Sequence, residues 1–245
     1  MYLPFERLFV LMSAEEHVVV GNRVLSTLAQ AQYRNLWPGL KRVVLDAERV
    51  LYRPGDAVTN LYFPIDSVVS LLCKVDEKRT VEVAMEGNES IVGLMIYLGG
   101  ENSSHLSVVR NAGVAMQVDV GFLTSYAHSP GPLRDLLNKS VHALVTQIVR
   151  SGVCNRFHSV DARVARWLLM TRDRTGSRIF LATQESIARL LGVRRSSVTA
   201  AASSFQLQRM IDYRRGRIEI LDGNKLHAAC CSCYGVIKRQ YDSFL

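Results

Sequence analysis

The stretch TQESIARLLGVRRSSVTAAASSF, residues 183–205, decides the fold that we predict for this chain. Thr183 can cap a first helix, because its hydroxyl accepts a hydrogen bond from a free amide of the first turn. Gly192 suits the positive φ at which many helices end. Between these two residues, three aliphatic side chains form one apolar stripe at helical spacing: Ile187, Leu190 and Leu191.

A second helix is predicted to begin at residues 194–197, Arg-Arg-Ser-Ser. Its apolar face comprises Val198, Ala201, Ala202 and Phe205. In a helix-turn-helix, the second helix enters the major groove and reads base edges. Residues 183–205 therefore predict a DNA-binding unit, with an ordinary helical hairpin as the alternative.

A basic β-hairpin is predicted directly after these helices, at residues 211–221. Ile218 and Ile220 alternate with Arg217 and Glu219, and Gly216 suits the turn. A hairpin beside a helix-turn-helix forms the wing of a winged-helix domain, so the two patterns together are more specific than either one.

Positive charge is concentrated in the part of the chain that carries these elements. The 245 residues have a net charge of +8. Residues 151–245 hold 16 Lys and Arg against 7 Asp and Glu, a balance of +9, whereas residues 1–150 hold 14 against 15, a balance of −1. A phosphate-binding face needs such an excess. We therefore expect double-stranded DNA as the partner.

The composition is that of a globular protein. Hydrophobic residues make up 48% of the chain and charged residues 21%, which argues against disorder. No apolar run reaches the roughly 18 residues of a membrane span, and the opening residues lack the basic start of a secretory signal. We expect a cytoplasmic protein that has no contact with a membrane and whose five cysteines are mostly reduced.

Residues 1–130 are expected to form a helical segment followed by a β domain. The helical segment comprises residues 1–40, and apolar spacing predicts mainly helix over residues 13–40. Residues 41–130 contain short β-like runs separated by breaks such as Arg53-Pro54-Gly55-Asp56, which is typical of a compact barrel or sandwich.

A long helix is predicted over residues 131–158. Its apolar residues follow the 4-3-4 spacing of a coiled coil and define a predicted dimer seam: Leu137, Val141, Leu144 and Ile148. A helix buried against its own domain would show the same stripe. A dimer is favoured here because helix-turn-helix units bind paired half-sites. We expect the winged-helix domain to begin at residue 159.

Several motifs of this sequence are similar to those of a known family. They are YRPGD (52–56), LYFPIDSVVSLL (61–72), VEVAMEGNESIVGL (81–94), CNRFHSVDARVARWLLMTRDR (154–174), TQESIARLLGVRRSSVTAAA (183–202) and IDYRRGRIEILD (211–222). Over roughly residues 22–234 the chain resembles the Crp/Fnr family of bacterial transcription regulators. The resemblance implies an α+β fold with a jelly-roll-like β-roll that senses a signal, a dimerisation helix and a C-terminal winged helix-turn-helix. It also implies a homodimer that is not an enzyme, with RNA polymerase as a further candidate partner.

The resemblance also implies roles for individual residues. The positions that face bases in the family are Arg195, Ser196, Thr199 and Ala200. Family members often carry an acidic residue at the position of Ser196 and an arginine at that of Ala200, so a different half-site is expected. Candidates for phosphate contact, which positions the protein without specifying a sequence, are Thr183, Gln184, Arg194, Ser197, Arg214, Arg215 and Arg217. A solvated surface is the alternative for the wing arginines.

No effector or cofactor is predicted. The Gly-Glu pair that holds the ribose in cyclic-nucleotide members is replaced by Gly93-Leu94, and no arginine precedes a small residue in NSSHLSVV, residues 102–109. Cyclic AMP binding in the family's mode is not expected, because a buried phosphate needs a cationic partner. His105 is read as a surface or structural residue. Iron–sulfur sensing is not expected either, since Cys73, a predicted core residue, is the one cysteine before residue 150. Haem leaves no spacing pattern and stays open.

Three cysteines follow His227 closely: Cys230, Cys231 and Cys233. Metal binding and thiol redox sensing are both conceivable, but no second cysteine pair is visible in the chain. We therefore predict no metal site, and expect one C-terminal helix over residues 225–241 whose small cysteines pack against the domain.

Two other functional classes fit the residues less well. A metal-dependent enzyme on the β domain would need two or three histidines with a carboxylate, and residues 43–120 contain only His105. A sensor or adaptor with a degenerate helix-turn-helix is disfavoured by the intact Arg194-Arg195 pair and by the basic wing.

Overall fold

The computed structural model describes residues 21–31, 34–77 and 79–245. Predictions for residues 1–20 lie outside this part of the chain. The first described helix, α3 (Arg23–Gln30), begins at Asn22, whose side chain accepts hydrogen bonds from the amides of Val24 and Leu25. The same buried side chain donates to the carbonyl oxygens of Pro64 and Ser90 at 2.8 and 3.2 Å. Asn22 therefore fixes the start of α3 to the neighbouring β domain.

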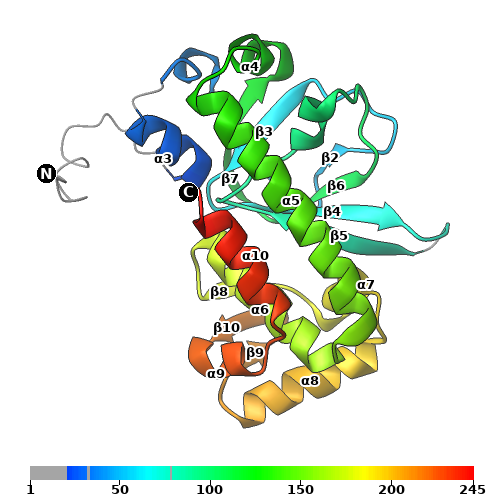
Figure 1. The fold of residues 1–245 in the computed structure, drawn as a ribbon. Helices are drawn as coiled ribbons and strands as arrows, with labels where there is room; N and C mark the ends of the chain where they lie inside the picture. Colours follow the sequence, from blue (N-terminus) through cyan, green and yellow to red (C-terminus); the bar gives the residue numbers. More distant parts are fainter. Residues whose placement is uncertain (1–20, 32–33, 78) are drawn as a thin grey trace, which may run out of the picture.

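This β domain is an antiparallel β-roll of two sheets (Figure 1). One sheet has the strand order β1-β7-β3 and the other β2-β6-β4-β5. The strands are β1 (Lys41–Leu45), β2 (Val50–Tyr52), β3 (Asn60–Pro64), β4 (Val68–Lys74), β5 (Thr80–Glu86), β6 (Leu106–Asn111) and β7 (Gly113–Asp119), with 3-10 turns η1 (Trp37–Gly39) and η2 (Leu94–Leu98). Their inward residues form one core with α3, because alternate side chains of a strand face the same side of a sheet.

Two helices follow the β-roll. Asp119 caps α4 (Val120–Ala127) by accepting a hydrogen bond from the amide of Phe122 at 2.9 Å. Pro132 opens α5 (Pro132–Phe157), a position that suits proline because the first amides of a helix lack intrahelical partners. α5 runs the length of the molecule beside the β-roll and reaches the C-terminal domain (Figure 1).

The predicted dimer seam on α5 is wrong at two of its four positions. Leu137 is fully buried in the β-roll core, and Leu144 packs with Leu71 and Ala84 of the second sheet. These two leucines lie against the chain's own sheet because the helix covers an apolar sheet face that would otherwise meet water. Val141 and Ile148 are half-buried.

The C-terminal domain is a winged helix-turn-helix. It contains α6 (Val160–Thr175), β8 (Ile179–Leu181), α7 (Gln184–Leu191), α8 (Arg195–Leu207), β9 (Ile211–Arg214), β10 (Arg217–Ile220), α9 (Gly223–Ala228) and α10 (Cys233–Asp242). The three strands form one antiparallel sheet in the order β8-β10-β9. The predicted α+β fold class is thus confirmed.

The C-terminal helix predicted over residues 225–241 is wrong, because the chain breaks at residues 229–232 into α9 and α10. Asp222 caps α9 through the amides of Asn224 and Lys225. The break lets α10 turn back along α5 (Figure 1) and bury Tyr234, Ile237 and Tyr241 in the shared core.

The β-roll and the winged-helix domain share one continuous core. Val68, Leu72 and Met85 of the β-roll belong to the same buried cluster as Leu168 of α6 and Leu190 of α7. The helix-turn-helix therefore rests directly on the β-roll. No helix in the described ranges is long and apolar enough to cross a membrane.

Candidate nucleic-acid interface

The helix-turn-helix is built by local capping interactions. Thr183 and Ser186 form a capping box at the start of α7, in which each side chain bonds the other residue's amide at 3.0 Å. Gly192 ends α7 at a φ of +63°, the left-handed conformation that glycine adopts without steric cost. Arg163 of α6 donates to the carbonyl oxygen of Leu191. These contacts set the angle at which α8 leaves the turn.

The two faces of α8 differ as the sequence predicts. Val198, Ala201, Ala202 and Phe205 are each at most 2% exposed and form the inner face. The four predicted base-contact residues are all exposed. Positions i, i+1, i+4 and i+5 share one side of a helix, so these side chains form a single outward surface, the reading face: Arg195, Ser196, Thr199 and Ala200.

Two residues of the reading face interact with the start of α7. The hydroxyl of Thr199 lies 2.6 Å from Oε1 of Gln184, so this predicted base contact and this predicted phosphate contact touch each other. Nε of Arg195 lies 3.9 Å from Oε2 of Glu185, and both side chains are about 70% exposed. Such a long, solvated pair contributes little, so Arg195 can exchange Glu185 for a nucleic-acid acceptor.

The wing presents one unpaired cation at its tip. Arg215 and Gly216 have φ values of +51° and +80°, the positive pair that a type I′ hairpin turn requires. Arg214 pairs with Asp212 at 3.0 Å and Arg217 with Glu219 at 3.2 Å, both on the wing itself. Arg215 makes no ion pair within the described part of the chain, so it is the wing arginine most available to a phosphate.

A groove of about 440 Å³ joins the wing to both helices of the helix-turn-helix. It brings together four predicted contact residues and three for which the sequence analysis predicted no contact with DNA. The lining residues are Thr183, Gln184, Glu185, Arg195, Tyr213, Arg215 and Gly216. Arg194, Arg214 and Arg217 are exposed outside this lining, and Ser197 is half-buried.

Tyr213 is a site residue that sequence analysis missed. Its hydroxyl donates to the carbonyl oxygen of Ala182 at 2.7 Å and so ties β9 to the start of α7. Burial raises the pKa of Tyr213 to about 12, with Arg195 acting in the opposite direction. The phenol is therefore protonated at neutral pH and keeps this bond. The sequence did contain a signal for this role, because in the alternating pattern of the hairpin Tyr213 falls on the side that faces the domain.

The β-roll positions that hold a cyclic nucleotide in the family carry different chemistry here. Gly93 has a φ of +89°, and Leu94 is buried in the β-roll core. His105, read from the sequence as a surface or structural residue, is only 9% exposed, and burial lowers its pKa. The side chains of Leu94 and His105 are thus both uncharged at physiological pH.

The cysteines lie away from the reading face. Cys73, predicted as a core residue, is half-buried near the end of β4. Cys231 and Cys233 are buried, and they meet Cys154 of α5 and His158, the residue that ends α5. Sequence analysis did not connect these residues, because Cys154 and Cys231 are 77 positions apart.

Comparison with known proteins agrees with this geometry. A family model described as the Crp-like helix-turn-helix domain matches residues 162–229. No curated protein matches the chain significantly. Similar solved structures include FixK2 from Bradyrhizobium japonicum, with 14% identity, a TM-score of 0.67, and coverage of 78% of this chain and 98% of that chain.

Two further solved structures have the same fold. A CRP-family transcriptional regulator from Thermus thermophilus is 16% identical with a TM-score of 0.62, covering 77% of this chain and 95% of that chain. The c-di-GMP-responsive global regulator CLP of Xanthomonas campestris is 16% identical with a TM-score of 0.61, covering 78% of this chain and 98% of that chain. Residues 162–229 therefore match a Crp-like helix-turn-helix domain, and the chain as a whole shares the fold of these three solved structures.

Proposed function

We propose that this chain is a homodimeric, sequence-specific DNA-binding transcription regulator that places α8 in the major groove. The observation that carries the proposal is the reading face, where four exposed positions of α8 stand beside the groove that leads to the wing. The excess positive charge after residue 150 supports a polyanionic partner. Action on chromosomal DNA would require a cytoplasmic location.

The residues of the interface divide into two roles. Arg195 can donate two hydrogen bonds to a guanine, which is worth about 1–3 kcal/mol of discrimination against another base. Ser196 and Ala200 are small and uncharged, so they favour a half-site unlike that read by family members with charged residues there. Thr183, Gln184 and Arg215 line the same groove and supply donors for phosphate oxygens, which position the protein on the duplex.

A dimer is supported by the solvent-facing side of α5. Val145, Val149 and Val153 follow at intervals of four, with Phe157 at the end of the helix, and they are 42%, 59%, 37% and 74% exposed. Such an apolar row on one helix is suited to pairing with its copy. A two-fold dimer would bind two half-sites about 34 Å apart, one turn of the DNA helix.

The test is selection of genomic DNA fragments that the full chain binds, followed by a gel shift with competitor DNA. We expect the selected fragments to share a pseudo-palindromic sequence, and we expect the chain to stay bound to it in an excess of unrelated competitor DNA. If no fragment shifted even at low salt, where phosphate contacts are strongest, DNA binding would be refuted. The chain would then be better described as a sensor or adaptor with a degenerate helix-turn-helix.

A further inference from the structure

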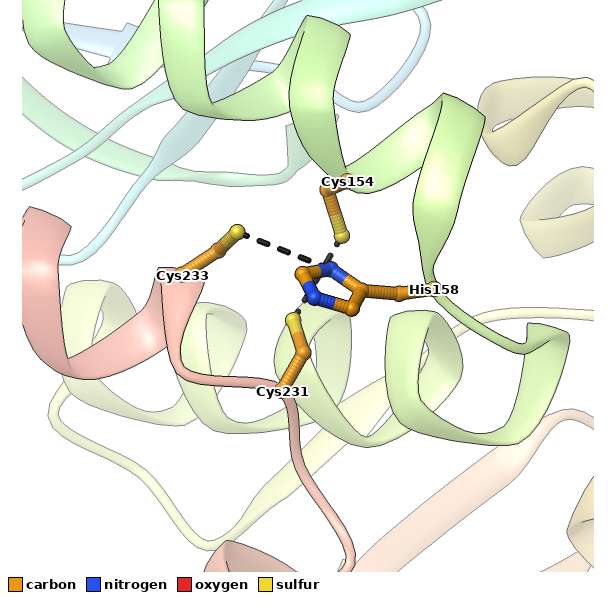
Figure 2. A group of neighbouring side chains, drawn as sticks. All are labelled: Cys154, His158, Cys231 and Cys233. Carbon is orange, nitrogen blue, oxygen red and sulfur yellow. Dashed lines mark hydrogen bonds between the residues drawn. The ribbon is translucent and has the colours of Figure 1, made fainter.

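Four soft-ligand side chains meet at the junction between the long helix and the DNA-binding domain. Cys154 and His158 come from the end of α5, Cys231 comes from the segment between α9 and α10, and Cys233 is the first residue of α10. Figure 2 shows all four side chains pointing toward one another. Cys154 and His158 can converge because residues four apart share a helix face, and the break after α9 brings in the other pair.

The spacing of the four ligand atoms fits a tetrahedral metal ion. Metal–sulfur bonds of about 2.3 Å and metal–nitrogen bonds of about 2.0 Å place tetrahedral ligand atoms roughly 3.5–3.8 Å apart. Sγ of Cys154 lies 3.5 Å from Sγ of Cys231, and Sγ of Cys233 lies 3.7 Å from Nδ1 of His158. All four atoms lie within 4.8 Å of one another. Only small movements would be needed to enclose an ion.

The cluster is buried, which distinguishes it from a chance group of thiols on the protein surface. Cys154, Cys231 and Cys233 are at most 9% exposed, and His158 is half-buried. A disulfide would use two of the three sulfur atoms and would leave the third thiol and the imidazole without a role. A metal ion uses all four.

The surrounding charge also suits an anionic metal centre. Three thiolates, one neutral imidazole and a divalent ion carry a net charge of −1. Two buried arginines of α6, Arg163 and Arg166, interact electrostatically with Cys154 and Cys231. Neither arginine forms an ion pair with a carboxylate in the described ranges, although Glu82 interacts electrostatically with Arg166 at longer range. The Nε of each arginine lacks a hydrogen-bond partner in these ranges. A buried cation requires such a counter-charge.

We propose that Cys154, His158, Cys231 and Cys233 form a structural zinc site with three thiolate ligands and one imidazole ligand. Thiolate and imidazole donors select zinc over oxygen-preferring cations, and four protein ligands leave no open catalytic position. Binding releases the three thiol protons to solvent. The ion connects the end of α5 to the start of α10, and thereby fixes the winged-helix domain to the long helix.

The site is tested on the full chain, purified under reducing conditions without chelator. Elemental analysis should find close to one zinc per chain. Exchange of zinc for Co²⁺ should produce thiolate-to-cobalt charge-transfer absorption and the d–d bands of tetrahedral coordination. Both measurements use the unaltered protein and no DNA, so their outcome is independent of whether the chain binds an operator.

Single substitutions identify the ligands. Cys154→Ser, Cys231→Ser and His158→Ala should each weaken zinc binding by at least the roughly tenfold that loss of an outer-shell partner costs. Cys230→Ser is the matched control, because this neighbouring thiol lies outside the ligand set and should keep full zinc occupancy. Far-ultraviolet circular dichroism verifies that each variant is folded.

Three results would overturn the proposal. The first is a reduced, unaltered chain that takes up neither zinc nor cobalt with thiolate absorption, and the second is a Cys231→Ser variant that binds zinc as tightly as the parent. The third is a Cys154–Cys231 disulfide in the isolated protein that, once reduced, still binds no metal.

Discussion

Replacement of Arg174 by methionine should destabilise the whole chain, because this arginine connects four elements from a buried position. Its side chain is 4% exposed, and its Nε lies 2.7 Å from Oε1 of Glu89, which is itself 7% exposed. Its Nη2 donates to Oε1 of Gln147 on α5 at 2.6 Å, and its Nε donates to the carbonyl oxygen of Met85 at 3.2 Å. The ring of Tyr241 on α10 lies 6.0 Å from the guanidinium carbon.

The expected loss of stability follows from the charge of Glu89, which the substitution leaves without a partner. Removing one partner of a buried ion pair costs about 3–5 kcal/mol, a large share of the 5–15 kcal/mol by which proteins are typically stable. At about 2–4 °C per kcal/mol for a chain of this size, Tm should fall by roughly 6–20 °C. Burial already raises the pKa of Glu89 while Arg174 lowers it. Without Arg174 the carboxyl accepts a proton more readily, so the loss should shrink as the pH falls toward 4.

Urea unfolding of the Arg174→Met variant at pH 7 measures this loss directly. The matched control adds Glu89→Gln, which removes the stranded charge and should recover a substantial part of the stability. The reasoning is refuted if Arg174→Met costs less than about 1 kcal/mol, the value of an ordinary hydrogen bond. It is equally refuted if the second substitution recovers nothing.

Three further substitutions test other parts of the structure. Val149→Glu, at a position 59% exposed, should change the monomer's stability by no more than about 0.5 kcal/mol but should dissociate the proposed dimer in analytical ultracentrifugation; an unchanged mass would count against that face. Arg215→Gly keeps the positive φ without strain and should weaken binding to all DNA sequences equally, lowering the salt slope by about one; an unaltered slope would exclude a phosphate contact. Burial, and then the charge of Glu89, raise the pKa of Glu86 well above its usual range in the folded state. At pH values between the ordinary pKa of the unfolded state and this raised pKa, the folded state keeps a proton that the unfolded state loses. The folded state therefore becomes less stable as the pH rises through this range. Glu86→Gln removes this dependence: its Tm should match the parent's near pH 4 and exceed it at pH 7, and a Tm difference independent of pH would contradict the assignment.

The helix-turn-helix could be predicted from sequence because its signals are local. The cap at Thr183, the left-handed turn at Gly192 and the buried face from Val198 to Phe205 each depend on residues within a few positions. The wing was predictable for the same reason, since Gly216 and the alternating isoleucines mark a hairpin over a short distance.

The dimer seam shows where periodicity stops being informative. An apolar stripe indicates that one face of a helix is buried. It does not indicate whether the chain's own domain or a second copy covers that face. Leu137 and Leu144 are covered by the β-roll, whereas the exposed apolar row lies on another side of α5, at Val145, Val149 and Val153. This distinction depends on how the β-roll packs, which no local pattern reports.

The cysteine–histidine cluster was missed for a related reason. The sequence shows Cys230, Cys231 and Cys233 as a local group and places Cys154 and His158 more than 70 positions earlier. Only the return of α10 along α5 brings the two pairs into contact, and the break between α9 and α10 that allows this return was itself predicted as continuous helix.

Base reading by Arg195 of α8 is tested most directly by the ratio of the affinities for specific and for unrelated DNA. The affinities of the full chain and of Arg195→Ala are measured at one salt concentration for a selected genomic fragment and for unrelated DNA of equal length. We predict that the substitution costs about 1–3 kcal/mol on the selected fragment and leaves the affinity for unrelated DNA nearly unchanged. An equal loss on both DNAs would contradict base reading by Arg195 and would reduce it to a phosphate contact.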